Sequence, residues 1–255
     1  MISQRFFLIN KSGIKLECQI DRNQTKTKQS IVFIAGGFGS DSIRGNMQIP
    51  WFEWFHRMGF ATFRINFRGI GESGGELAFA TTTAGLEDMH PALDYIRKSD
   101  WADLDNFGLM GHSYGGGLLF HEIAAHPEHK YKFLILLSPR VDTQHRYESD
   151  PTIDLADWKK KEFIIFNGDK GPERRHYSLY SDSLNFQPWG IADKIKVPTL
   201  IIHGDKDDTV PYEQSVRLHK LIKSSDLITL HGCKHQYHKC GYNDQLHEAT
   251  MDEAK

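Results

Sequence analysis

The sequence predicts an α/β protein built on a mostly parallel, doubly wound sheet. Short apolar runs, rich in β-branched and aromatic residues, recur along the 255-residue chain. Near-continuous runs of this kind are typical of strands buried on both faces of a parallel sheet. Segments with apolar residues at helical spacing lie between them. Strands that alternate with helices in this way predict a doubly wound architecture.

The expected strands follow from the apolar runs in chain order. An antiparallel hairpin is expected first, from Phe6–Ile9 and Ile14–Cys18, because Asn10–Gly13 between them is a turn sequence. The expected sheet strands are Ser30–Ile34, Phe60–Ile65, Asn106–Met110, Phe133–Leu137, Thr199–Ile202 and Leu227–Leu230.

Four segments between these strands are expected to be helical. The clearest is 82–98, where Leu86, Met89, Leu93 and Ile96 repeat at helical spacing. The others are the aromatic-rich Ile49–Met58, then Gly116–Ala125, and Tyr212–Lys223.

Residues Arg140–Ile195 interrupt the alternation with many charges and scattered aromatic residues. They contain one more strand-like run, Glu162–Phe166, followed by the turn sequence Asn167–Pro172. A connection of this length exceeds those of compact domains. We therefore expect one domain over residues 1–255 with a small cap inserted at 140–195; an ordinary long crossover is the alternative.

Composition restricts the partners and the compartment. The net charge of −2, from 31 basic and 33 acidic residues, gives no reason to expect a nucleic-acid or anionic-membrane partner. Three cysteines do not suggest a disulfide framework, and their odd number fits a reducing compartment. The apolar run Phe6–Ile9 is too short for a signal peptide, and no run is long enough to span a bilayer. A cytoplasmic protein is expected.

One serine lies within a cluster of glycines. The segment Gly111–Gly115 reads G-H-S-Y-G, a G-x-S-x-G pattern that follows an expected strand and precedes an expected helix. In this context the pattern indicates a nucleophilic serine exposed on a sharp turn, close to the backbone donors of a helix N-terminus. The alternative is a glycine-rich turn that only packs a helix against the sheet.

A serine in this architecture requires an acid and a histidine later in the chain, at the ends of later strands. The segment His203–Pro211 follows one strand and holds three aspartates, Asp205, Asp207 and Asp208. The segment His231–His238 follows the next strand and holds several histidines. The order serine, acid, histidine is therefore present, with more than one candidate for each of the last two positions.

The chain resembles the α/β-hydrolase superfamily over essentially its whole length. It is most similar in style to small bacterial carboxylesterases of the cinnamoyl/feruloyl-esterase and serine-aminopeptidase-like groups, which also carry an inserted cap. The α/β-hydrolase fold is therefore expected. The segments that carry the resemblance are Gly36–Ser40, Asn66–Ser73, Gly111–Gly116, His203–Pro211 and Gly232–His235.

The resemblance implies roles for individual residues. The family pattern H-G-x-x-D-x-x-V places the acid on Asp207, and G-x-x-H places the base on His235, with Ser113 as nucleophile. The backbone N–H groups of Phe38 and Tyr114 would form the oxyanion hole. Asp205 and Asp208 are then turn formers, His203 is structural, and His238 is a second choice for the base. Where the family often has His-Gly, this chain has Ala35-Gly36-Gly37, which changes the local hydrogen bonding.

Two other patterns are given ordinary explanations. The loop Arg68–Gly75 is rich in glycine but lacks the lysine of a P-loop, so we interpret it as a structural support of the oxyanion loop. The histidines and cysteines near the C-terminus do not have the spacing of zinc ligands. They are His231, Cys233, His235, His238, Cys240 and His247. No metal and no organic cofactor is expected.

The expected function is therefore hydrolysis of small-molecule carboxylic esters through an acyl-enzyme intermediate. The alternatives are a thioesterase or a peptidase that uses the same triad, or a non-catalytic binding protein on this fold. A nucleotide-binding protein is disfavoured because Gly36–Gly39 lacks the G-x-G-x-x-G spacing. Aromatic residues of the cap either line an acyl pocket or form the cap's own core: Tyr147, Trp158, Phe163, Phe166, Tyr177, Tyr180, Phe186 and Trp189. Four arginines are interpreted as a solvated face rather than as a site for an acidic substrate group: Arg140, Arg146, Arg174 and Arg175.

Overall fold

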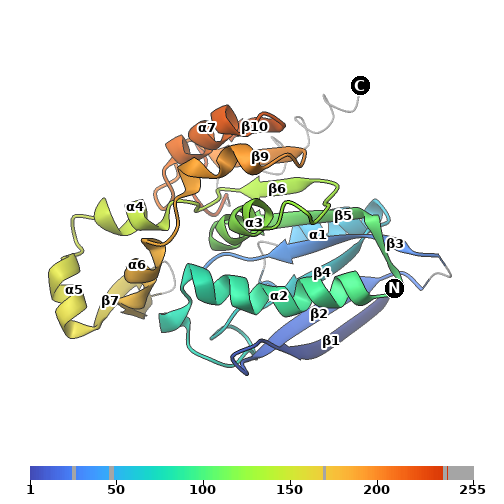
Figure 1. Ribbon diagram of the computed structural model, residues 1–255, viewed down its shortest axis with the longest axis horizontal. Coiled ribbons are helices and arrows are strands. Elements are labelled where there is room, and N and C mark those ends of the chain that lie inside the picture. Colours follow the sequence, from blue (N-terminus) through green and yellow to red (C-terminus); the bar gives the residue numbers. More distant parts are fainter. Residues whose placement is uncertain (25–26, 46–48, 169–170, 238–239, 241–255) are drawn as a thin grey trace.

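The computed structural model describes residues 1–24, 27–45, 49–168, 171–237 and 240. An eight-stranded sheet runs through the molecule in the order β1-β2-β4-β3-β5-β6-β9-β10 (Figure 1). The antiparallel hairpin β1–β2 forms one edge, and the strands from β4 to β10 are parallel. The predicted α/β-hydrolase fold is confirmed. The strands are β1 (Ile2–Ile9), β2 (Lys15–Arg22), β3 (Gln29–Ala35), β4 (Ala61–Ile65), β5 (Ala102–His112), β6 (Leu134–Leu137), β9 (Thr199–Gly204) and β10 (Ser225–Leu230).

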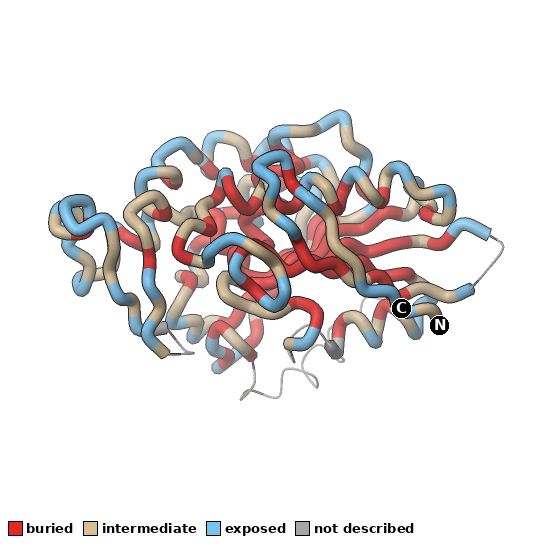
Figure 2. Tube along the Cα trace, turned by 90° about the horizontal axis from the view of Figure 1, so that it is seen from below, coloured by how far each residue is buried: buried red, intermediate tan, exposed pale blue. Residues whose placement is uncertain are grey.

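Helices cover both faces of the sheet, so the parallel strands are buried on both sides. Ile31, Phe33 and Ala35 of β3 point into one core, together with side chains of α2 (Thr82–Lys98) and α3 (Tyr114–Ala125). Val32 and Ile34 of the same strand point into a second core with α1 (Ile49–Arg57). Figure 2 shows the buried residues following the strands through the interior. This is why the strands are continuous apolar runs. Helix α7 (Tyr212–Leu221) lies between β9 and β10 in the sequence.

The chain between β6 and β9 forms a separate group of short elements at one end of the molecule (left in Figure 1). We refer to residues 140–195 as the inserted segment. A small apolar cluster of its own, with buried Tyr147, Trp158 and Leu179, holds it together. Its elements are α4 (Thr143–Glu148), α5 (Leu155–Lys161), β7 (Phe163–Gly168), β8 (Gly171–His176), α6 (Ser178–Ser183) and the 3-10 turns Pro188–Gly190 and Ala192–Lys194.

Strand β8 was not expected, because its sequence GPERRH has no apolar pattern. It forms by pairing with β7 as an antiparallel hairpin. Within the described part of the chain, no helix is long and apolar enough to cross a membrane.

Candidate active site

Ser113 lies on a strained turn between β5 and α3. Its backbone has φ 51° and ψ −113°, a conformation that L-residues rarely adopt. Such strain persists only where the surroundings impose it, and it is typical of functional sites. The Ser113 N–H donates to Leu137 O (2.8 Å), and Ser113 O accepts from Gly117 N and Arg140 N (both 2.9 Å). These bonds hold the serine between β6 and α3.

The glycines around Ser113 are explained by close backbone approach. A Cβ at position 111 would lie 2.6 Å from Gly116 N, and a Cβ at position 115 would collide with Ala35 O and lie 2.6 Å from Gly36 O. The Gly115 N–H donates to Gly36 O (3.1 Å). The glycine cluster therefore lets α3 start directly against the loop that follows β3, which is a more specific reason than flexibility.

His235 and Asp207 meet Ser113 in one hydrogen-bonded chain. His235 Nε2 lies 3.0 Å from Ser113 Oγ, and His235 Nδ1 lies 2.7 Å from Asp207 Oδ2. The three residues come from loops after β5, β9 and β10, all at the carboxyl ends of parallel strands. This spacing is the hydrogen-bond reach that a nucleophile, a base and an orienting acid require.

The Asp207 carboxylate is buried and hydrogen-bonded to two backbone N–H groups and two imidazoles. Its side chain is fully buried. Asp207 Oδ1 accepts from the Thr209 and Val210 N–H groups (both 2.8 Å), and Oδ2 lies 3.0 Å from His203 Nε2 as well as near His235. Burial alone would raise the pKa of this carboxyl, but the hydrogen bonds with His203 and His235 outweigh burial and hold the pKa well below its usual value. Asp207 is therefore a carboxylate at neutral pH, and His203 helps to fix its position.

The other two candidates for the acid, Asp205 and Asp208, link the loop after β9, which holds Asp207, to the loop after β10, which holds His235 and is called the histidine loop below. Asp205 accepts from Gly232 N (2.8 Å) and lies 3.1 Å from His231 Nδ1, and Asp208 accepts from Lys234 Nζ (2.8 Å). Neither carboxylate contacts the imidazole of the base candidate. The second-choice base, His238, lies outside the described residues, as does His247.

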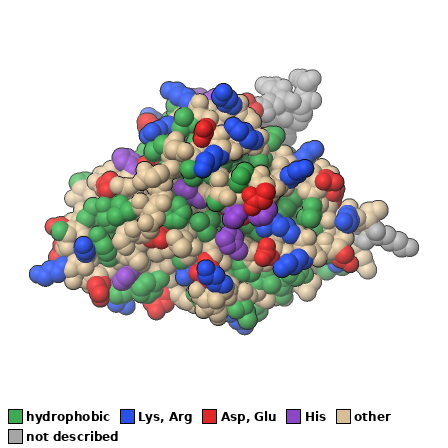
Figure 3. Space-filling model, in the orientation of Figure 1, with side chains coloured by type: hydrophobic (Ala, Val, Ile, Leu, Met, Phe, Trp, Pro, Cys, Tyr) green, Lys and Arg blue, Asp and Glu red, His purple; other side chains and the backbone are tan. Residues whose placement is uncertain are grey.

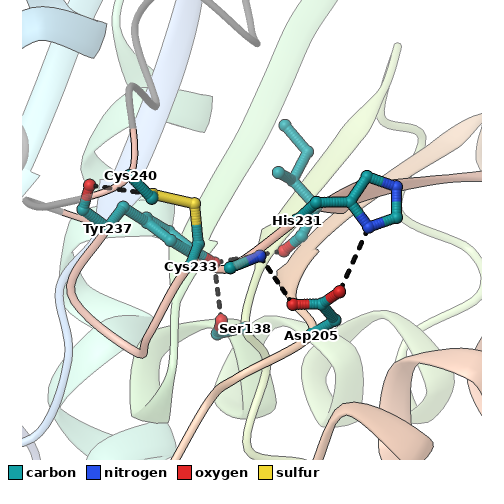
Figure 4. The surroundings of a disulfide bond; sticks show 8 residues. Ser138, Asp205, His231, Cys233, Tyr237 and Cys240 are labelled. Atoms are coloured by element: carbon teal, nitrogen blue, oxygen red, sulfur yellow. Dashed lines mark hydrogen bonds and ion pairs between the residues drawn. A yellow bond between two sulfur atoms is a disulfide. The ribbon is translucent and has the colours of Figure 1, made fainter.

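The histidine loop is closed by a disulfide between Cys233 and Cys240, which the number of cysteines had not suggested (Figure 4). The two Cα atoms are 5.1 Å apart, within the normal range for a disulfide. Between them, the Tyr237 hydroxyl hydrogen-bonds Ser138 Oγ (2.5 Å) and Ile202 O (3.2 Å). Cys18 is a buried free thiol, and burial raises its pKa to about 12. The disulfide and Tyr237 thus anchor the loop that carries His235.

Two backbone N–H groups beside Ser113 are available to bind an oxyanion. Among the residues described, neither the Phe38 N–H nor the Tyr114 N–H donates a hydrogen bond. The two residues are neighbours, because their rings pack edge to face with centroids 5.7 Å apart. Tyr114 is the first residue of α3, so its N–H is one of the unpaired donors of a helix N-terminus. Unpaired N–H groups at this place fit the oxyanion hole expected from the sequence.

A buried polar network supports the loop that carries Phe38. The Asn66 side chain accepts from Ser42 N (2.7 Å) and donates to Asp41 Oδ1 (2.9 Å) and Glu17 Oε2 (3.0 Å). Arg44 binds the buried Glu17. The loop Arg68–Gly75 joins this network, because the Glu72 N–H donates to Glu17 Oε2 (2.9 Å) and the Ser73 hydroxyl donates to Asn66 O (2.7 Å). Polar groups of the loop Arg68–Gly75 are thus used inside the protein, which fits a supporting role rather than phosphate binding.

The His112 imidazole packs against Gly37, in the loop that carries Phe38. A Cβ at position 37 would lie 2.9 Å from His112 Nδ1, so Gly37 is needed there. Burial lowers the pKa of His112 to about 3, which makes it a neutral imidazole. Its Nδ1 has no hydrogen-bond partner among the described residues. The hydrogen bonding here is therefore incomplete, at the place where the Ala35-Gly36-Gly37 sequence departs from the family pattern.

A second group of histidines lies away from Ser113, on α2 and at the end of α3. His90 Nε2 lies 2.9 Å from Glu122 Oε2, and His126 is close enough to both for the three to share an ion. Figure 3 shows histidine and acidic side chains gathered over these helices near the middle of the face in view. Arg97 lies 2.9 Å from His129 Nδ1 and 3.8 Å from Glu122 Oε1, so a positive charge already faces this carboxylate.

The interpretation of the four arginines as a solvated face was wrong for two of them. Arg140 and Arg175 are buried, at 8% and 7% exposure, and both guanidinium groups face the Phe38 ring (5.4 and 5.1 Å). Sequence reasoning had weighed Arg140 as a site for an acidic substrate group and had favoured a solvated face. Its position directly after Ser138-Pro139, at the end of β6, is the signal that could have placed it near the serine.

Comparisons with known proteins show what the chain is similar to. Residues 49–254 match the prolyl oligopeptidase family. The acylamino-acid-releasing enzyme of Sus scrofa is 25% identical over 86% of this chain, and the palmitoyl-protein thioesterase ABHD10 of Bos taurus is 26% identical over 77%. The chain spans 30% and 63% of the length of these two relatives.

Among solved structures, Est1E from Butyrivibrio proteoclasticus with bound ferulic acid has a TM-score of 0.81 at 26% identity, covering 98% of this chain and all of that one. Mouse ABHD10, at 22% identity, shows the same fold with a TM-score of 0.78, covering 99% of this chain and all of that one. The match to the prolyl oligopeptidase family, over residues 49–254, covers most of the chain and includes the segments that hold Ser113, Asp207 and His235. The chain therefore belongs to the prolyl oligopeptidase family of α/β hydrolases.

Proposed function

We propose that the protein is a serine hydrolase that cleaves carboxylic esters of small molecules through an acyl-enzyme intermediate. The observation that carries the proposal is the continuous hydrogen-bonded chain Ser113–His235–Asp207 beside two unpaired backbone donors. The full-length structural similarity to Est1E, a structure that holds ferulic acid, supports an ester as the substrate class.

The reaction uses the triad, the two backbone donors and one water molecule. His235 Nε2 takes the Ser113 Oγ proton as Oγ attacks the ester carbonyl carbon, and the Phe38 and Tyr114 N–H groups bind the oxyanion. The tetrahedral intermediate collapses, the C–O bond to the alcohol breaks, and His235 gives its proton to the leaving alkoxide. A water molecule activated by His235 then releases the acid. Asp207 holds the imidazole in place and stabilises its protonated form.

Two related reactions use the same groups. The similarity to ABHD10 supports thioester cleavage, and the family match together with the acylamino-acid-releasing enzyme supports peptide cleavage. Both differ from ester hydrolysis only in the leaving group. A non-catalytic role is disfavoured because no member of the expected triad is missing.

The proposal is tested with 4-nitrophenyl esters of increasing acyl length, with thioesters and peptide anilides of the same acyl groups beside them. We expect the unsubstituted protein to prefer the oxygen esters. The kcat of Ser113→Ala should be at least a thousandfold lower than that of the unsubstituted protein. A folded Ser113→Ala protein with near-normal turnover would overturn the proposal.

A cytoplasmic location stays a prediction. The disulfide weighs against it, because such bonds are rare in reducing compartments.

A further inference from the structure

Arg140 is the exception among the buried arginines. Four arginines are at most 9% exposed. Three of them form an ion pair with a carboxylate: Arg64 with Asp21, Arg68 with Asp88, and Arg175 with Glu173. No carboxylate of the described residues lies within 4.0 Å of the Arg140 guanidinium, and its Nε has no hydrogen-bond partner. A buried charge without a partner costs several kcal/mol, so its presence calls for a reason.

Two aromatic rings and a buried hydroxyl group surround the Arg140 guanidinium. The guanidinium faces the rings of Phe38 (5.4 Å) and Tyr114 (5.2 Å), and these aromatic faces stabilise a cation without neutralising it. The Tyr147 hydroxyl, on a side chain that is only 1% exposed, interacts electrostatically with Arg140 and has no hydrogen-bond partner in the described chain. Arg175, which also faces the Phe38 ring (5.1 Å), likewise keeps an unpaired Nε among the described residues.

Arg140 is linked to the candidate active site through its backbone and through two aromatic neighbours. The Arg140 N–H donates to Ser113 O, and the two rings that Arg140 faces belong to the residues whose N–H groups are proposed to bind the oxyanion. The planar guanidinium fork matches a carboxylate with two parallel hydrogen bonds.

We infer that Arg140, together with the Tyr147 hydroxyl, binds a carboxylate carried by the substrate, so that the substrate is an anionic ester. The inference rests on the proposed ester hydrolysis and names its substrate class.

The test compares pairs of esters, one with a free carboxylate and one without. For the acyl side, the pair is the 4-nitrophenyl monoester of adipic acid and 4-nitrophenyl hexanoate, with glutarate and suberate monoesters to vary the reach. For the alcohol side, the pair is 4-(hexanoyloxy)benzoic acid and its methyl ester. The readout is the ratio of kcat/KM for the anionic ester to that for the neutral ester, and the arm with the higher ratio tells which half of the substrate carries the carboxylate.

We expect a ratio of about ten or more in one arm, because hydrogen bonds to a charged group typically contribute this much. Arg140→Met should lower that ratio at least tenfold, and Arg140→Lys should keep part of it. Arg174→Met is the matched control, because Arg174 is an exposed arginine of the inserted segment, on β8 beside Arg175, and it should leave the ratio unchanged. A ratio near one in both arms, or an equal ratio in Arg140→Met, would overturn the inference and assign Arg140 to packing alone.

A binding measurement separates this inference from the proposed function. Calorimetric titration of monomethyl adipate into Ser113→Ala, and into Ser113→Ala that also carries Arg140→Lys, does not depend on turnover, because neither protein has the proposed nucleophile. We expect saturable binding that is weakened at least fivefold by Arg140→Lys. If neutral esters are hydrolysed but monomethyl adipate does not bind, the inference fails and the proposed function stands. If it binds but no ester is hydrolysed, the proposed function fails and the anion site stands.

Discussion

At the scale of single residues, the account depends on which carboxylate serves the histidine. Three aspartates occur within four positions of one loop, and each makes a different set of contacts. Asp207 is fully buried and accepts from two backbone N–H groups and two imidazoles, whereas Asp205 and Asp208 are tied to exposed groups of the histidine loop. The three can therefore be separated by experiment.

Asp207→Asn should lower kcat by about 10⁴, because the amide cannot stabilise the protonated imidazole and favours the wrong tautomer of His235. Asp205→Asn, in the same loop, should lower kcat no more than severalfold. Steady-state hydrolysis of one 4-nitrophenyl ester by both variants measures the difference. Comparable losses in the two variants would contradict the assignment of the acid to Asp207.

At the scale of elements, the disulfide fixes the loop after β10. Cys233 and Cys240 flank His235 at a sequence separation of 7, and Tyr237 between them bonds to the end of β9 through Ile202 O. Closing so short a loop removes conformational entropy from the unfolded chain worth about 2 kcal/mol. The same closure restrains His235 relative to Ser113.

Replacing both cysteines, Cys233→Ser with Cys240→Ser, should lower the free energy of unfolding by about 2 kcal/mol in denaturant titrations. It should also lower kcat, because the base is then held less firmly. Cys18→Ala, which leaves the disulfide in place, is the control. A thiol assay on the unfolded, unreduced protein should find one free thiol, that of Cys18. Three free thiols would contradict the disulfide.

Some of the elements could be predicted from the sequence, and others could not. Strands such as 30–34 and 133–137 were predictable because they are buried on both faces. Strand β8 was not, because pairing with β7 rather than its own pattern makes it a strand. The cysteine pairing and the burial of Arg140 were also missed, since both depend on which distant segments the fold brings together. The triad candidates were found because their order and their place after strands are properties of the chain itself.

At the scale of the whole molecule, buried neutral histidines set the response to acid. Burial lowers the pKa of His121 to about 4 and that of His112 to about 3. In the unfolded chain both return to about 6.5. Below that pH the unfolded state binds protons that the folded state does not, so stability falls as the pH drops from 6.5 toward 4.

His121 allows this to be measured away from Ser113, since its ring packs on Phe186 with centroids 4.8 Å apart. We expect the unsubstituted protein to lose about 1 to 2 kcal/mol more than His121→Gln does between pH 7 and pH 5. Denaturant titrations of both proteins at the two pH values give the difference. Equal losses would mean that His121 takes up its proton in the folded state as readily as in the unfolded state.

The central claim is that Ser113 is the nucleophile of a hydrolase, and covalent labelling tests it most directly. The protein is treated with a fluorophosphonate, and the modified peptide is mapped by mass spectrometry while hydrolysis of a 4-nitrophenyl ester is followed on the same sample. The account predicts one label per chain, on Ser113, with activity lost in proportion, and neither label nor turnover in Ser113→Ala. A label on another residue, or a Ser113→Ala protein that still hydrolyses the ester, would contradict it.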